Sequence, residues 1–386
     1  MNVDPNWKPH ATARQSEYID AVQIHGSVSA AARALGVDRK SIRKCLQAAQ
    51  RQAERAGYSP EHDYTQPIPH GFRAKGHSTL VDKRSGETVL QWTKTTRDEA
   101  AQEAAMREAI SAMAESIPPA EPAFGPKTWD DDLLTLYPIT DHHLGMLAWG
   151  DETGADWDTD LAEDTLYRWF ARAVGLTPDS GTAVLADLGD FLHYDSLESI
   201  TPAHGNILDS DTRYPRLVRA AIRALRRIID LLLNHHQHVH VIIAEGNHNP
   251  SGSVWLREAF AALYEEEPRV TIDKTVSPYY CYTHGSTALF FHHGHQTKPD
   301  KLAQVCAAEY RQVFGESAHA YAHCGHRHHR QVIETPLMLV EQHPTLAARD
   351  AHAARHGYQA KRMASAITYC RRHGEVGRVS IPAEAV

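Results

Sequence analysis

Five short segments rich in histidine occur in one order along this chain, and each follows an apolar run. Their side chains include carboxylates, imidazoles and one carboxamide, which bind divalent metal ions in proteins. The segments are Asp141-His142-His143, Gly189-Asp190-Phe191-Leu192-His193, Gly246-Asn247-His248, His293-Gly294-His295 and Gly325-His326-Arg327-His328. One such segment occurs often by chance, but five in series predict a centre of two metal ions that hydrolyses phosphate esters.

The spacing within the segments suits such a centre, which holds its two ions about 3.5–4 Å apart. Asp141 and His143 are two residues apart at a predicted strand end, so both side chains can point to the same side. His326 and His328 repeat this spacing, and a glycine before Asp190 allows a sharp turn. This donor set predicts two divalent cations, with manganese expected first and iron, zinc or magnesium as alternatives.

Apolar runs that end at these segments predict the strands that position them. The runs cover residues 133–139, 182–188, 240–244, 287–291 and 318–322. Residues 214–233 carry apolar side chains at alternating spacings of four and three, which predicts an amphipathic helix. Strands that alternate with helices predict α/β layers with polar sites at the strand ends. A last helix is expected near Ala360–Tyr369.

The segments resemble the motifs of the calcineurin-like metallophosphoesterases, which read D-x-H, G-D-x-x-[DH], G-N-H-[DE], H and G-H-x-H. The resemblance covers roughly residues 133–335 and implies a four-layer αββα sandwich. His295 is an alternative to His293 as a ligand, and His248 would stabilise the transition state or protonate the leaving oxygen. The implied ligands are Asp141, His143, His328 and Asp190 for one ion, and the bridging Asp190 with Asn247, His293 and His326 for the other.

Two positions refine what the resemblance implies. His193, three residues after Asp190, matches the DNA-repair nuclease branch, in which this histidine aids phosphodiester cleavage. Asn249 stands where the motif has Glu or Asp, so the carboxylate that would orient His248 is missing. We therefore expect the ions to activate a water molecule, and either His193 or His248 to supply a proton to the leaving oxygen.

The N-terminal segment differs in charge from the rest of the chain. Residues 1–56 hold nine Lys/Arg and five Asp/Glu, a balance of +4, whereas the whole chain carries −8. Ser27 and Asp38 can cap two short helices that Gly36 separates, which predicts a helix-turn-helix. A small helical bundle that docks on a partner is the alternative. The cations expected to meet DNA are Arg39, Lys40, Arg43 and Lys44.

We predict three parts: a helix-turn-helix domain over 1–57, a hairpin, polar helix and proline-rich linker over 58–127, and a metallophosphoesterase domain over 128–386. The hairpin strands are expected at residues 77–81 and 88–92, and the polar helix at residues 97–115. The five cysteines have no paired spacing, which argues against disulfides and a cysteine zinc site. With no membrane span or signal pattern in the sequence, we expect a cytoplasmic protein.

Three functions are consistent with these patterns: a nuclease brought to DNA by its N-terminal domain, an enzyme for small phosphate esters with a regulatory N-terminal domain, and a DNA-binding protein with a structural metal site. The layout resembles phage or prophage proteins that place a helix-turn-helix before this domain, which implies DNA as partner and the host cytoplasm as location. A homodimer is also expected from the nuclease branch.

Other histidines outside the five segments are interpreted as structural. They are histidines 204, 235, 236, 238, 240 and 343. An arginine stripe on the 214–233 helix (Arg219, Arg223, Arg226) is interpreted as a solvated face, with nucleic-acid contact as the alternative.

Overall fold

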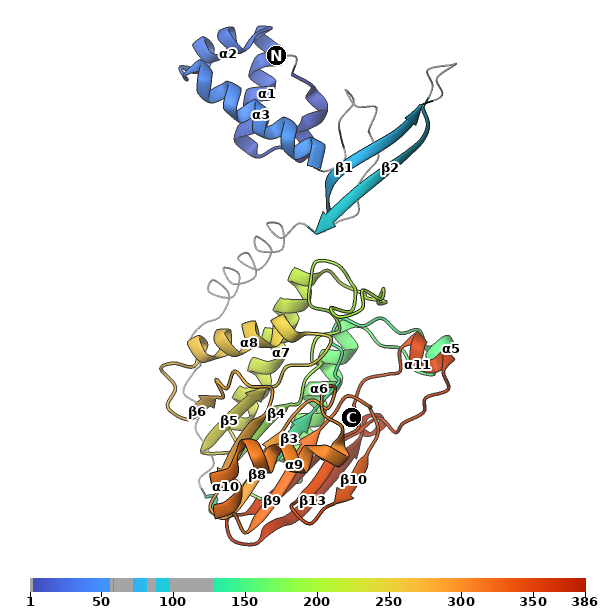
Figure 1. The fold of residues 1–386 in the computed structure, drawn as a ribbon. Coiled ribbons are helices and arrows are strands. Elements are labelled where there is room, and N and C mark those ends of the chain that lie inside the picture. Colours follow the sequence, from blue (N-terminus) through green and yellow to red (C-terminus); the bar gives the residue numbers. More distant parts are fainter. Residues whose placement is uncertain (1–2, 56–57, 59–71, 82–87, 98–127) are drawn as a thin grey trace. The chain divides into compact units, whose positions relative to one another are not determined.

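The computed structural model describes residues 3–55, 58, 72–81, 88–97 and 128–386. It divides into two compact units, Met1–Ala104 and Ala105–Val386, and each is considered by itself (Figure 1). Among the described residues, no helix combines the length and the apolar composition needed to cross a bilayer.

The first unit begins with a 3-10 turn and three helices. The Ser27 side chain accepts a hydrogen bond from the Ala30 amide, and Gly36 ends the second helix in the left-handed conformation. Asp38 accepts hydrogen bonds from the amides of Lys40 and Ser41, so both predicted caps are confirmed. The elements are η1 (Pro5–His10), α1 (Ala13–His25), α2 (Val28–Leu35) and α3 (Arg39–Arg55).

The predicted hairpin is also present. Strands β1 (Phe72–Val81) and β2 (Thr88–Arg97) pair antiparallel, with Ser78 opposite Trp92. Both strands extend beyond the predicted ranges. The helix expected over residues 97–115 lies outside the described residues except at its first position, and the proline-rich linker lies wholly outside them.

The second unit contains two sheets. One has six strands in the order β13-β12-β3-β4-β5-β6, and the other has five in the order β10-β11-β9-β8-β7. Strands β3, β4, β5 and β6 run parallel, as do β8, β9 and β11. The strands are β3 (Asp130–Ile139), β4 (Ser180–Asp187), β5 (His238–Ile243), β6 (Val270–Ile272), β7 (Tyr280–His284), β8 (Thr287–Phe291), β9 (His319–Cys324), β10 (Gln331–Glu334), β11 (Leu339–Gln342), β12 (Met363–Cys370) and β13 (Gly374–Pro382).

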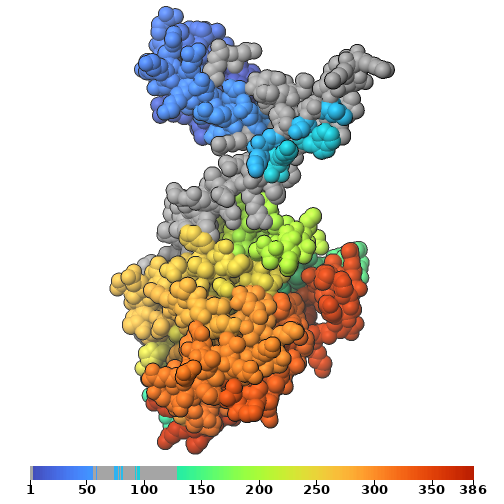
Figure 2. Space-filling view, in the orientation of Figure 1, coloured from blue at the N-terminus to red at the C-terminus, as the bar shows by residue number. Residues whose placement is uncertain are grey.

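Helices cover the outer faces of the two sheets, so the unit has four layers (Figure 1). Side chains alternate along β4: Leu185 packs toward the helices, whereas Val184 and Ala186 pack between the sheets. The helices beside the larger sheet are α6 (Thr159–Val174), α7 (Tyr214–Leu233) and α8 (Pro250–Leu263), and those beside the smaller sheet are α9 (Pro299–Glu309) and α10 (Arg311–Glu316). The short helices α5 (Gly150–Thr153) and α11 (Ala351–Arg355) lie next to each other (Figure 1). Figure 2 shows the same face in space-filling form, with the segment from α9 to β10 in orange.

The prediction of a helix near Ala360–Tyr369 is wrong. These residues form most of β12, which pairs antiparallel with both β3 and β13. Ile367 and Tyr369 fill the space between the two sheets, whereas Ala364 and Ala366 face the helical layer. This two-sided burial requires an extended strand, and it outweighs the helical tendency of the alanines.

Candidate metal centre

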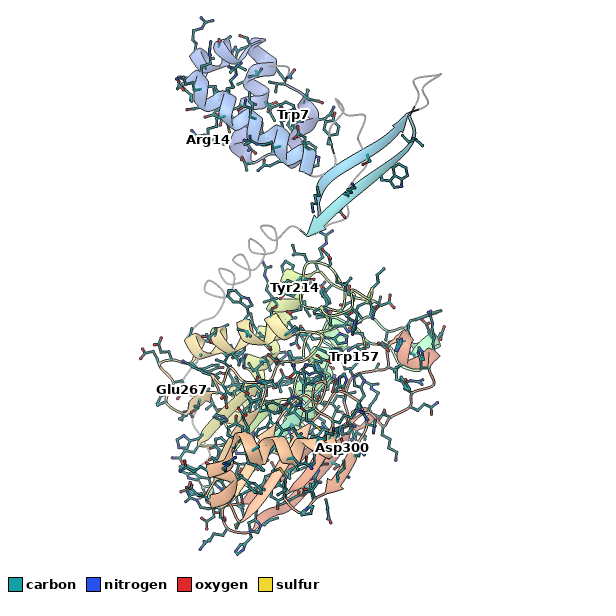
Figure 3. The ribbon with its side chains drawn as sticks, viewed as in Figure 1. Trp7, Arg14, Trp157, Tyr214, Glu267 and Asp300 are labelled. Atoms are coloured by element: carbon teal, nitrogen blue, oxygen red, sulfur yellow. The ribbon has the colours of Figure 1, made fainter. Side chains whose placement is uncertain are left out.

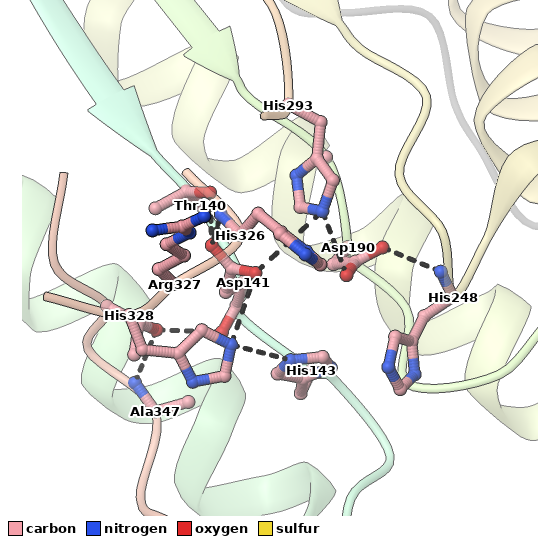
Figure 4. Close-up of polar contacts among 12 residues, drawn as sticks. Thr140, Asp141, His143, Asp190, His248, His293, His326, Arg327, His328 and Ala347 are labelled. Carbon is pink, nitrogen blue, oxygen red and sulfur yellow. Dashed lines mark hydrogen bonds and ion pairs between the residues drawn. The ribbon is translucent and has the colours of Figure 1, made fainter. Parts of the chain in front are cut away.

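The five segments meet where strands of both sheets end. Asp141, Asp190 and Asn247 follow β3, β4 and β5, while His293 and His326 follow β8 and β9. The first two loops run side by side, because the Asp141 amide donates to the Gly189 carbonyl and the His143 amide to the Asp190 carbonyl, both at 3.0 Å. Parallel strands thus bring distant segments to one edge, as the sequence predicted (Figure 4).

Among the described residues, two of the groups of side chains that could hold a cation share Asp141. In each group the donor atoms lie within 4.8 Å of one another. His295 is in neither group, whereas His293 is in one, so the geometry favours His293 of the two alternatives. The first group is Asp141, His143 and His328, and the second is Asp141, Asp190, His293 and His326.

Asp141 is therefore shared by both groups, whereas Asp190 belongs to one. The role of Asp190 as the bridging ligand stays a prediction. Asn247 lies beside the second group, with its Oδ1 atom 3.1 Å from His293 Nε2. All seven predicted ligands thus converge on one region, and their roles as ligands are proposed below.

The donor atoms fit a metal better than they fit one another. Asp141 Oδ1 is buried and has no hydrogen-bond partner among the described residues. It lies 3.2 Å from His328 Nε2, and the Nε2 atoms of His143 and His328 face each other at 3.4 Å. This buried oxygen is thus held by ion pairs with His328 and His293 and by no hydrogen bond of normal geometry, and a cation among these atoms would satisfy it more fully.

Charge is concentrated on Asp190 and His293. Burial alone would raise the pKa of Asp190, but the charge and hydrogen bond of His293, together with the charges of His248 and His143, hold that pKa well below its usual range. Burial opposes protonation of His293, yet the Asp190 carboxylate raises the pKa of His293 to about 9. His293 Nε2 and Asp190 Oδ2 are 3.0 Å apart. Because metals bind neutral imidazole, a cation at this position would displace the His293 proton.

The two predicted catalytic histidines lie next to the first group. His248 Nδ1 is 2.7 Å from the backbone carbonyl oxygen of His193, so Nδ1 carries the proton that donates and Nε2 stays available. The rings of His193 and His248 are stacked, 5.5 Å apart. Burial, followed by the charge of His248, lowers the pKa of His193 to about 3. His193 is therefore neutral near pH 7.

Several positioning contacts were not predicted. The carbonyl of His193 orients His248 in place of the missing carboxylate. Asn249 is fully buried, and its Oδ1 accepts a hydrogen bond from the Asp190 amide. Thr345 Oγ1 donates to the Asp141 carbonyl at 2.7 Å. These contacts join residues at least 55 positions apart, which no local motif reveals.

The backbone of the centre is strained. In the described part of the chain, the only non-glycine residues with positive φ angles are five of the proposed ligands: Asp141, His143, Asp190, His326 and His328. Such conformations persist where surrounding structure enforces them, and they cluster at functional sites. The backbone at Gly325 lies very close to Thr140, so that a Cβ atom at position 325 would collide with Thr140 Oγ1. The centre therefore requires a glycine at this position.

The structural interpretation of other histidines agrees with their contacts. His236 Nε2 lies 3.0 Å from the Tyr137 hydroxyl. His343 Nε2 lies 2.9 Å from His323 Nδ1, inside a buried group that also contains Glu341. The Glu341 carboxylate is bound by Arg378, so these atoms already have partners.

The arginine stripe on α7 likewise has partners within the fold. Arg223 forms an ion pair with Glu163 of α6, and Arg226 lies 3.8 Å from Asp230. Arg219 also has an interaction partner. These contacts favour the solvated-face interpretation over nucleic-acid contact.

No family model matches the chain, and no curated protein matches it in sequence. A predicted phosphoesterase from Streptococcus pneumoniae has 12% identity and a TM-score of 0.27, and the match covers 65% of this chain and 98% of that one. Vacuolar Protein Sorting 29 from Cryptosporidium parvum has 13% identity and a TM-score of 0.30, and the match covers 65% of this chain and 100% of that one. An archaeal phosphodiesterase has 12% identity and a TM-score of 0.32, and the match covers 64% of this chain and 99% of that one. Similarity at this level does not define a family.

Proposed function

We propose that this chain is a metal-dependent phosphodiesterase of the calcineurin-like type that cleaves DNA. The observation that carries the proposal is the pair of donor groups that share Asp141, whose Oδ1 atom lacks a hydrogen-bond partner among the described residues. Two divalent ions, with manganese preferred, would polarise the phosphate ester and make a water molecule nucleophilic. The expected ligands are Asp141, His143, Asp190 and His328 for one ion, and Asp190, Asn247, His293 and His326 for the other.

The protein's own contribution to the reaction is a proton held at a fixed atom. His248 Nδ1 donates to the His193 carbonyl, so in the imidazolium form of His248 the second proton is on Nε2. Nε2 would give this proton to the leaving oxygen, and His248 would be left neutral with its remaining proton on Nδ1. The His248 amide also donates to Asp190 Oδ1 at 2.8 Å, which fixes the backbone of His248 against a proposed ligand. His193 supports the reaction by packing against both His143 and His248.

The N-terminal unit is proposed to bring this centre to DNA. Ile42 and Leu46 of α3 are buried in the unit's core, whereas Arg39, Lys40, Arg43 and Lys44 are exposed. None of these four cations has an ion pair among the described residues. A helix with this distribution can enter a major groove and contact phosphates and base edges.

The function is tested by assaying duplex and single-stranded DNA beside bis(p-nitrophenyl) phosphate, with manganese and with a chelator. We expect manganese-dependent cleavage of DNA and of the small diester, and loss of both with chelator. Hydrolysis of nucleoside phosphates without any DNA cleavage would instead support the enzyme for small phosphate esters.

Replacing Arg43 and Lys44 together with glutamine should weaken DNA binding by at least tenfold. If both contact phosphates, the slope of log affinity against log salt should fall by about 1.8, since each contact contributes about 0.9. Fluorescence anisotropy with labelled duplex measures both quantities. Lys8→Gln is the matched control, because Lys8 is already paired with Asp20 in the same unit. Unchanged affinity in the double variant would refute the role of α3.

A further inference from the structure

An open groove of about 500 Å³ lies at the start of α7, near Tyr214 in Figure 3. This volume lies within the usual range of small-ligand sites. No step of the proposed reaction uses the groove. Its lining residues are Ser210, Asp211, Thr212, Arg213 and Arg216.

The groove is joined by hydrogen bonds to the two loops that carry His143 and His193. The Asp211 amide donates to the carbonyl of Gly145, two residues after His143, at 3.3 Å. The hydroxyl of Tyr194, the residue after His193, donates to the Thr212 carbonyl at 2.5 Å. These two hydrogen bonds place the groove's loop directly beside the loops that carry His143 and His193.

The residues that line the groove carry two positive charges, from Arg213 and Arg216, and one negative charge, from Asp211, although the chain as a whole is acidic. Both carboxylate oxygens of Asp211 accept hydrogen bonds from Thr159, one from its amide at 2.8 Å and one from its hydroxyl at 2.6 Å. Arg213 is exposed and has no ion pair within the described ranges. Arg216 lies 3.7 Å from Asp160, but these side chains are 66% and 83% exposed, so water and salt weaken the pair.

We propose that this groove binds a second phosphate of the substrate, one that neighbours the scissile phosphate along a polynucleotide strand. The inference rests on the proposed phosphodiesterase activity and specifies its substrate class. Arginine suits the task, because its planar guanidinium can donate two parallel hydrogen bonds to phosphate oxygens. A small diester has only one phosphate and would leave the groove empty, so the groove would favour polynucleotides.

The test compares Arg213→Gln and Arg213→Gln/Arg216→Gln with the full-length parent on two substrates. For a single-stranded oligonucleotide, KM should rise about tenfold in the double variant. The slope of log(kcat/KM) against log salt should fall by about 0.7 for each lost phosphate contact. For bis(p-nitrophenyl) phosphate, kcat/KM should stay within twofold of the parent. Arg372→Gln is the control, because it removes a charge from the β12–β13 turn, beside the amino end of β3 and away from the centre.

The outcomes separate the two proposals. If the double variant matches the parent on the oligonucleotide, or loses activity equally on both substrates, the groove is not a phosphate site. If the parent cleaves neither substrate with manganese present, the phosphodiesterase proposal itself is wrong. A selective, salt-dependent loss on the oligonucleotide supports the second phosphate site.

Discussion

Asp190→Ala is expected to lower kcat/KM on every phosphodiester by at least about a thousandfold, or about 4 kcal/mol of transition-state stabilisation. Asp190 is buried, and its two oxygens contact His293 and the His248 amide. Its loss removes a proposed ligand and one of the contacts that fix the proposed proton donor. Steady-state kinetics, with the manganese content of the purified protein, measure both effects.

The same variant separates catalysis from a structural metal site. A catalytic centre predicts that Asp190→Ala keeps its circular dichroism spectrum and a cooperative unfolding transition while activity and bound metal are lost. A structural site predicts that the variant unfolds. Asp190→Asn keeps the shape of the side chain but removes its charge. If this variant also loses activity, the loss cannot be attributed to altered packing. Asp130→Asn is the matched control at the opposite end of the neighbouring strand β3.

His248→Asn is expected to slow DNA cleavage by about a hundredfold, within the range for loss of a general acid. The effect should depend on the leaving group. The sugar alkoxide released from DNA needs a proton, whereas p-nitrophenolate leaves readily without one. Hydrolysis of bis(p-nitrophenyl) phosphate should therefore fall much less. Rates for diesters with leaving groups of graded pKa would show a steeper dependence in the variant.

A loss of equal size for all leaving groups would contradict this role and would point to altered substrate positioning. His238→Asn provides the control, because His238 is exposed at the start of β5, at the far end from the centre. Its rates should match those of the parent with every substrate.

The sequence predicted the elements whose patterns are local. The helix over residues 214–233 has the bounds of α7, and the strand before each of the five segments is present. The convergence of the segments follows from parallel strands, whose carboxyl ends meet at one edge. Amphipathic periodicity and strand-end placement are properties of short stretches, so a single sequence reveals them.

Features that depend on distant partners could not be predicted in this way. Strand β12 was mistaken for a helix because its pairing with β3 joins residues more than 200 positions apart. The sharing of Asp141 between the two groups also depends on side-chain placement rather than on motif spacing. The groove beside α7 forms from a loop whose hydrogen bonds reach Gly145 and Thr159, and no motif marks it.

The left-handed backbone conformation of five residues at the centre has a consequence for which metal binds there. The fold itself holds these five proposed ligands in their left-handed backbone conformations, at a cost of order 1–3 kcal/mol for each residue, independently of any ion. One ion can then be exchanged for another with little rearrangement of the polypeptide. Because a site with oxygen and nitrogen donors binds manganese more weakly than iron or zinc in general, the supply of metals in the cell would also decide which ions occupy this one.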